Sequence, residues 1–412
     1  MKYVNIADDK VQKFIQIQLR KIGQLIKKMV PEVVSIVLSG SFSRGEGSIE
    51  LLSEDIFIIQ KDFDIFIFSK KIPDYSRYKL LKKIILKEIE TSNNKNYSNK
   101  NFRINLEFIN VNQLNGLLPD ISTYELKRNG LVIFGKKLLH LIPESVSNFN
   151  SSTILRILLN KLIGLIENNP FFNKNSLNVA YECYKTYIEI NTVLCILNRC
   201  YHTDYTNRLK ALKKHWYKFP KSIKELDNKL LDKIENAVSF KLKPIKNLKN
   251  LDVEDFWFET KDLLIKIIDV IVSFFICNPE KKDSDENLIT YLKKYYYFPY
   301  SQRFLHKFKI KSQFLNHLIS KAYILLEKSR ENLMPSINNL INLYLSSFFL
   351  LKAIKKNNII DEEYFKEAKL YIKEKKTFNS RLENWMKLAK TIISLKLNYD
   401  DKKIKKKSFK LI

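Results

Sequence analysis

Two short segments near the start of the chain carry side chains that together could hold phosphate groups and a divalent metal. The first, residues 39–48, is a turn rich in glycine and serine that follows a β-branched, apolar strand at 33–38. Glycine lets a ligand approach the backbone closely, and serine hydroxyls and backbone amides can donate to an anion. The second places Asp62 and Asp64 one residue apart at the start of another apolar strand.

The aspartate pair is the more specific signal. Strand alternation puts Asp62 and Asp64 on the same face, with Phe63 and Ile65 on the other. Two like charges on one face repel each other unless a cation lies between them. Mg²⁺ suits that position because it prefers carboxylate and phosphate oxygens, and Mn²⁺ is the alternative. A solvated turn followed by a strand edge would explain one aspartate here better than two.

A third carboxylate is expected on a neighbouring strand. Residues 102–109 alternate strictly, with Phe102, Ile104, Leu106 and Phe108 on one face and Arg103, Asn105 and Glu107 on the other. Glu107 can therefore join the two aspartates across the sheet. Taken alone, Glu107 would be interpreted as a solvent-facing residue of an amphipathic strand.

The order of these features resembles the nucleotidyltransferase superfamily that includes DNA polymerase β. The resemblance depends on Gly40-Ser41, Asp62-x-Asp64 and Glu107 on successive strands. Residues 124–135, a helix followed by a strand, look like the end of the core domain in many bacterial and archaeal members. The resemblance covers about residues 1–145. It implies that Gly40 and Ser41 hold the triphosphate, that both aspartates bind metal, and that Glu107 is the third acid and helps to activate the acceptor hydroxyl.

Three further residues are predicted nucleotide ligands. Ser43 lies in the same turn, and Arg44 could add a fixed positive charge there. Lys185 belongs to a helical segment, and helical domains beside such cores often lend a lysine to the triphosphate. The alternatives are an N-capping polar turn for Ser43 and a solvated lysine for Lys185.

The spacing departs from many members of the superfamily because residues 42–61 make a longer connection between Ser41 and Asp62. Residues 49–59 within it are predicted to form a hairpin with its turn at 53–55. A subgroup encoded near surface-polysaccharide genes looks similar, with Gly-Ser-Phe-x-Arg-Gly-Glu-Gly and an inserted hairpin.

The expected fold is an α/β nucleotidyltransferase core, a mixed sheet with flanking helices, followed by a large all-α region. Helical spacing at 9–29 and 77–90 and strands at 33–38, 63–68 and 102–109 define the core. Past Pro143 the strand pattern stops and helical spacing continues, including at 221–240 and 335–356. We place a catalytic domain at 1–148, a helical domain closing the active site at 149–280, and a C-terminal helical domain at 281–412.

Composition adds a broad constraint. The 412 residues carry a net charge of +28, almost all from lysine, which fits either a polyanion-binding surface or a genome biased towards Lys, Ile and Asn codons. The four cysteines form no zinc pattern, the first residues are no signal peptide, and the apolar runs are too short to span a bilayer. These features predict a cytoplasmic protein with no membrane span.

The sequence therefore predicts a metal-dependent nucleotidyltransferase that moves a nucleoside monophosphate from a nucleoside triphosphate to a hydroxyl acceptor and releases pyrophosphate. The acceptor stays open among a small molecule, a sugar, a protein and RNA. One alternative is an inactive module that binds nucleic acid through its basic surface. Another is an enzyme that makes a nucleotide second messenger or modifies RNA ends.

Overall fold

The structure is a computed structural model, and it describes residues 2–5, 8–51, 57–59, 63–91, 104–117, 120–143, 149, 151–171, 173, 175–244, 251–276, 288, 335–356, 359–372 and 381–409. Asp62 and the predicted hairpin turn at 53–55 lie outside the described residues.

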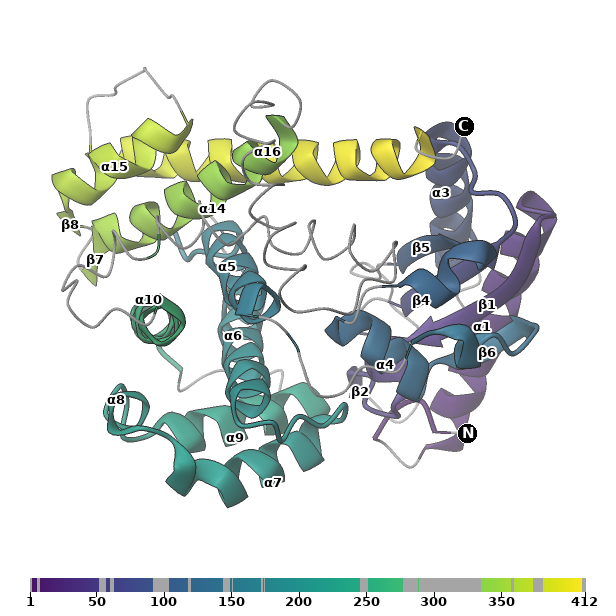
Figure 1. Cartoon of the computed structure of the whole chain (residues 1–412), viewed down its shortest axis with the longest axis horizontal. Helices are drawn as coiled ribbons and strands as arrows, with labels where there is room; N and C mark the ends of the chain where they lie inside the picture. Colours follow the sequence, from purple (N-terminus) through teal and green to yellow (C-terminus); the bar gives the residue numbers. More distant parts are fainter. Residues whose placement is uncertain are drawn as a thin grey trace, which may run out of the picture.

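A four-stranded sheet organises the N-terminal region (Figure 1). The elements there are, in chain order, α1 (Asp9–Met29), β1 (Val33–Ser39), α2 (Gly40–Ser43), β2 (Ile49–Leu51), β3 (Phe57–Ile59), β4 (Phe63–Ser69), α3 (Tyr75–Thr91), β5 (Ile104–Asn110), η1 (Val111–Gly116), α4 (Ile121–Asn129), β6 (Leu131–Gly135) and η2 (Leu139–Leu141). The strand order is β5-β4-β1-β6, with β4 and β5 parallel and β1 antiparallel to both β4 and β6. The predicted mixed sheet is confirmed.

Helices cover both faces of this sheet because the strands are apolar on both sides. The odd-numbered residues of β4 (Phe63, Ile65 and Ile67) pack with the apolar stripes of α1 and α3. On the opposite face Phe66 and Phe68 pack with residues of η1 and α4. Strands buried on both faces read as continuous apolar runs, which is how 65–68 appears in the sequence after Asp64.

The predicted hairpin insertion is confirmed in its two strands. β2 pairs antiparallel with β3, from Ile49 opposite Ile59 to Leu51 opposite Phe57. This small sheet is separate from the four-stranded one. The long connection before Asp62 is therefore taken up by a hairpin beside the core sheet.

The rest of the described chain is mostly helical. Its elements are α5 (Ser151–Glu167), α6 (Ser176–Leu197), α7 (Tyr205–His215), η3 (Trp216–Lys218), α8 (Lys221–Lys224), α9 (Leu230–Leu242), α10 (Val253–Ile276), α14 (Pro335–Ala353), β7 (Ile354–Lys355), β8 (Ile359–Ile360), α15 (Glu362–Ile372) and α16 (Arg381–Phe409). The single helix expected at 221–240 is in fact two, because α8 ends at Lys224 and α9 begins at Leu230. The helix expected at 335–356 ends at Ala353, where the β7–β8 pair begins.

One large apolar core joins the helices. α6 lies at its centre and contacts α5, α7, α9 and α10. Two buried tryptophans tie helices together through backbone carbonyls: Trp257 Nε1 donates to Leu165 O (3.0 Å) and Trp385 Nε1 to Leu350 O (2.8 Å). The long helix α16 runs past α14 and α5 and ends beside α3 of the sheet region (Figure 1). Within the described part of the chain, no helix combines the length and apolarity needed to cross a bilayer.

Candidate functional site

The predicted phosphate turn begins where β1 ends. Gly40 opens the short helix α2 with φ +72°, a conformation that side chains other than glycine rarely adopt. A Cβ atom at this position would lie 2.3 Å from Asp64 Oδ2. The glycine is therefore required for the backbone of the turn to approach the Asp64 carboxylate.

Aromatic packing between Phe42 of the turn and Phe63 of β4 holds the turn in place. Phe42 is buried and meets Phe63 edge-on, with ring centroids 4.8 Å apart. Gly47 lies against the Phe42 ring, where an added Cβ would be 2.4 Å away. Ser43 Oγ donates to Gly40 O (2.9 Å) across α2, and Ser41 is buried. This packing holds the turn close to the start of β4.

The carboxylates lie on one face of the sheet. In the β1–β4 register Ser39 is opposite Asp64, and in the parallel β4–β5 register Asp64 is opposite Asn105. Asn105 Nδ2 donates to Asp64 Oδ1 at 3.0 Å. Glu107 is in register with Phe66, one pleat further along the same face, so it lies diagonal to Asp64.

The structure thus brings together Gly40, Ser41, Asp64 and Glu107, while Asp62 lies outside the described residues. Within the described ranges, no group of three His, Cys, Asp or Glu side chains comes together as a metal site. Asn105 was not predicted to contact Asp64. Only the strand register reveals that it, and not Glu107, is the direct cross-strand neighbour.

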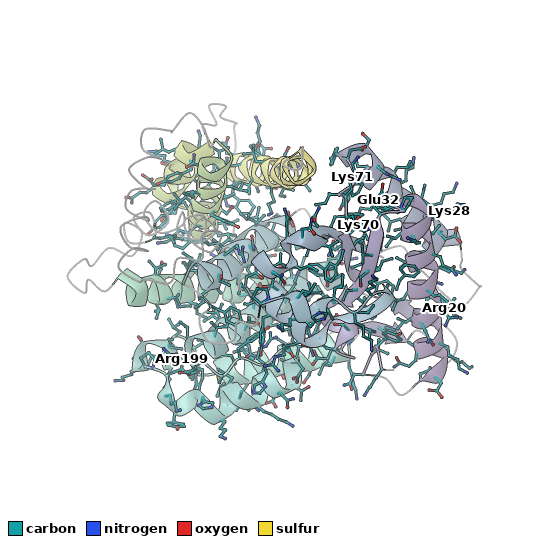
Figure 2. All side chains as sticks on the ribbon, turned by 45° about the vertical axis from the view of Figure 1, so that its right-hand side comes forward. Arg20, Lys28, Glu32, Lys70, Lys71 and Arg199 are labelled. Carbon is teal, nitrogen blue, oxygen red and sulfur yellow. The ribbon has the colours of Figure 1, made fainter. Side chains whose placement is uncertain are left out.

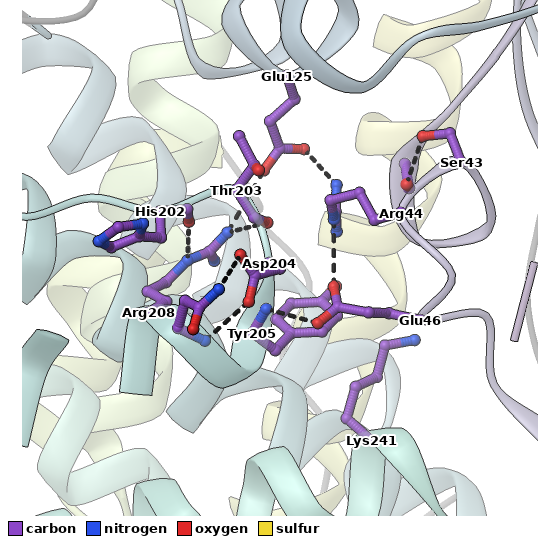
Figure 3. A network of polar contacts seen from close by, with 12 residues as sticks. Ser43, Arg44, Glu46, Glu125, His202, Thr203, Asp204, Tyr205, Arg208 and Lys241 are labelled. Atoms are coloured by element: carbon purple, nitrogen blue, oxygen red, sulfur yellow. Dashed lines mark hydrogen bonds and ion pairs between the residues drawn. The ribbon is translucent and has the colours of Figure 1, made fainter. Parts of the chain in front are cut away.

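A network of charges joins the turn to the helical region (Figure 3). Arg44 Nε donates to Glu46 at 3.2 Å and its Nη1 to Glu125 of α4 at 2.9 Å. Glu125 also accepts from the Tyr201 hydroxyl and from Arg208 Nη2, the latter at 3.4 Å. One carboxylate of the sheet region therefore serves both an arginine of the turn and two residues of the helical region.

A second set of contacts ties the end of the turn to α7 and α9. Glu46 Oε1 accepts from the backbone N–H of Tyr205 at 2.7 Å. Ser48 Oγ accepts from the buried Lys241 ammonium at 2.7 Å and donates to Lys241 O at 2.8 Å. The turn is consequently held between the sheet and the helical region, and its geometry depends on both.

Burial and charge set the protonation of this network. Burial lowers the pKa of Arg44, but the neighbouring Glu125 and Glu46 carboxylates outweigh burial and raise it above its ordinary value. Burial raises the pKa of Tyr205 to about 12 and that of Tyr201 well above its ordinary value. Both phenols therefore stay neutral, and the Tyr201 hydroxyl stays a donor at physiological pH.

Arg44 has a role here that the sequence did not indicate. Its side chain is 4% exposed and bonded to two carboxylates, and its guanidinium lies 5.3 Å from the centroid of the Tyr205 ring. The second arginine of the network, Arg208, donates hydrogen bonds to the backbone carbonyls of His202 and Thr203 at 2.8 Å each. The sequence carried one signal of this network: Glu46 stands between two glycines, and a charged side chain in so tight a turn needs an oppositely charged partner.

Lys185 lies in a second environment close to the turn. It lines a small pocket between α6 and α9 together with Tyr181, Tyr184, Ile188, Phe240 and Lys241. Since Lys241 is bonded to Ser48, this pocket adjoins the end of the turn. The pocket therefore presents one of the predicted nucleotide ligands beside the segment that holds the others.

Comparisons with known proteins add little evidence about the function of this chain. No protein-family model matches the chain, and no curated protein matches it. Among solved structures, it is similar to the crystal structure of spectinomycin adenyltransferase AAD(9) from Enterococcus faecialis with ATP and spectinomycin. The identity is 14%, the alignment covers 60% of this chain and 98% of that one, and the TM-score is 0.35. A likeness at this level carries no argument about function, so the proposal below depends on the residues of this chain.

Proposed function

We propose that this protein is a metal-dependent nucleotidyltransferase that transfers a nucleoside monophosphate from a nucleoside triphosphate to a hydroxyl acceptor. The observation that carries the proposal is the close approach of Gly40 to Asp64, on a sheet face that also bears Glu107. Because Gly40 has no Cβ, its backbone can lie against the Asp64 carboxylate, where any larger residue would collide with Oδ2; Asp64 would hold a divalent ion beside the turn that is expected to bind the phosphates.

The donor set fits a divalent cation of the magnesium type. Asp64 and Glu107 supply carboxylate oxygens, and Asp62 precedes Asp64 by two positions in the sequence. All are hard oxygen ligands, which suit Mg²⁺ or Mn²⁺. A bound divalent ion would neutralise charge on the phosphate oxygens of the substrate.

The chain itself supplies positioning. The Asn105 amide fixes one oxygen of Asp64, which leaves the other on the side of Gly40. Ser41 of the turn is the expected donor to the triphosphate, Ser43 could join it only by releasing Gly40 O, and Lys185 is the expected cation from the helical region. Glu107 would orient the acceptor hydroxyl or take its proton as the hydroxyl attacks the α-phosphate and pyrophosphate leaves. Catalysis of this kind depends mainly on orientation and electrostatics.

The contacts across the network support the assignment of a closing role to the predicted helical domain at 149–280. Glu46 and Ser48 are bonded to α7 and α9, so a nucleotide bound at the turn would lie beside helical side chains. Arg44 then acts by holding the turn in place.

The test is pyrophosphate release from a panel of nucleoside triphosphates with Mg²⁺ or Mn²⁺, in the presence of sugar, protein and RNA acceptors. We expect Asp64→Asn and Glu107→Gln each to lower turnover by at least about a hundredfold. Asp232→Asn, an exposed position on α9, is the matched control and should retain activity. Full turnover in an Asp62→Asn, Asp64→Asn double variant would reject the assignment. Salt-sensitive RNA binding that survives these changes, without turnover, would favour the nucleic-acid-binding alternative.

A further inference from the structure

The C-terminal end of α6 brings two cysteines together. Three backbone features define the end of the helix: the Cys200 N–H donates to Cys195 O (2.9 Å), the Arg199 N–H donates to Ile196 O (3.0 Å), and Arg199 has φ +55°. These are the six-to-one and five-to-two hydrogen bonds and the left-handed residue of a Schellman motif. In this motif the first and last residues place their side chains in contact, and here both are cysteine.

The two thiols occupy different environments. Cys195 is fully buried, and its Sγ lies 3.4 Å from both Asn191 Oδ1 and Arg208 O. Cys200 is half-buried and follows the exposed Arg199, which is labelled in Figure 2. An oxidant can therefore reach Cys200 first, with Cys195 directly behind it.

We propose that Cys195 and Cys200 form a reversible intramolecular disulfide when the protein meets a peroxide. The backbone hydrogen bond across the turn already holds the two residues close, as a disulfide requires, so the bond can form with little movement of the helix end. A glycine at position 199 would be the usual choice for this turn, and the arginine there keeps a positive charge beside the accessible thiol.

The chemistry balances in two steps. The Cys200 thiolate attacks one peroxide oxygen, the O–O bond breaks, and Cys200 becomes a sulfenic acid while hydroxide leaves and takes up a proton as water. The Cys195 thiol then attacks the Cys200 sulfur, forming the S–S bond and releasing a second water with the thiol proton. Two thiols lose two electrons in total, and the peroxide gains them.

Local electrostatics favour Cys200 as the attacking group. The hydrogen bond from the Cys195 thiol lowers the pKa of Cys200 against the opposing effect of burial, and the Lys218 ammonium adds to the lowering. The pKa of Cys195 is raised by the same hydrogen bond and by burial. The thiolate is the reactive form, so reaction begins at the half-buried residue.

Peptide mapping tests the proposal directly, because trypsin cleaves between the two cysteines at Arg199. The full-length reduced protein is treated with equimolar hydrogen peroxide, alkylated in denaturant and digested without reductant. We expect peptides 186–199 and 200–208 to appear joined, to separate on reduction, and to lose free thiol in equal fractions. Cys183 is buried, so its peptide, 175–185, should remain fully alkylated and serve as the internal reference. A non-reducing gel should show a monomer.

Matched variants separate this disulfide from other outcomes. Cys183→Ser should form the link at the wild-type rate, whereas Cys195→Ser should leave Cys200 to proceed to sulfinic acid. Sulfinic acid at Cys200 in the wild-type protein without the linked peptides, a link between two copies of peptide 200–208, or unchanged alkylation of both cysteines would each overturn the proposal.

Discussion

Glu125 is the side chain on which the contact between the turn and the helical region converges, and its removal gives a sharp prediction. It is 17% exposed and accepts hydrogen bonds from Arg44, Arg208 and Tyr201, while both arginine side chains are only 4% exposed. Glu125→Ala leaves two buried cations that have lost the carboxylate they share. Breaking a buried ion pair from one side typically costs about 3–5 kcal/mol.

The structure sets the expected value at the lower end of that range. Arg44 keeps its bond to Glu46 at 3.2 Å, and Arg208 keeps two backbone carbonyls at 2.8 Å. We therefore expect Glu125→Ala to lower the free energy of unfolding by about 3 kcal/mol. Glu235→Ala is the control, because Glu235 pairs with Lys213 at 2.7 Å with both side chains more than 40% exposed. That change should cost about 0.5 kcal/mol.

Urea unfolding provides the assay, followed by tryptophan fluorescence and by circular dichroism. Trp216, Trp257 and Trp385 all lie in the helical region, so fluorescence reports the part of the chain that Glu125 contacts through Arg208 and Tyr201. Glu125→Gln discriminates further between charge and packing. It preserves side-chain volume, but its amide nitrogen faces one of the two guanidinium groups as a donor while its oxygen still accepts from the other, so it should recover only part of the stability that alanine loses.

The reasoning is refuted if Glu125→Ala costs no more than Glu235→Ala. Recovery of near wild-type stability in Glu125→Gln would also refute it, because the loss in the alanine variant would then come from packing and not from the uncompensated arginines.

Three further predictions follow. Gly40→Ala should abolish metal-dependent turnover, measured as pyrophosphate release, because the added Cβ would displace Asp64. It should also lower the free energy of unfolding in urea by about 1–2 kcal/mol, because alanine is strained at φ +72°. Lys161→Met should lower the free energy of unfolding by about 3 kcal/mol, because it removes the ammonium bonded to the buried Glu182 carboxylate at 2.7 Å, and adding Glu182→Leu should restore most of that loss in urea unfolding. Burial raises the pKa of Asp227, but hydrogen bonds from its lysine partner and a backbone N–H outweigh burial and lower it. Its contribution is therefore present at neutral pH and lost as the pH falls through the lowered pKa, so Asp227→Asn should cost up to about 1 kcal/mol at pH 7 and nothing in strong acid, as followed by unfolding across pH.

Much of the fold could be predicted from local patterns. Apolar spacing at 9–29 and alternation at 102–109 predicted α1 and β5 closely, because periodicity depends only on which face of an element is buried. The inserted hairpin was predictable for the same reason. The division of 221–240 into α8 and α9 was not, because the helical spacing of apolar residues continues across the break between Lys224 and Leu230.

The sequence by itself determined the chemistry available at the candidate site: a glycine–serine turn after one strand and carboxylates on two others. Residue types and alternation are local properties, so they needed no tertiary information. Tertiary structure decided which side chains meet. It paired Asn105 with Asp64, placed Glu107 one pleat away, and turned Arg44 towards Glu125. Register and the packing of distant helices set these contacts, and neither is encoded in the spacing of a single segment.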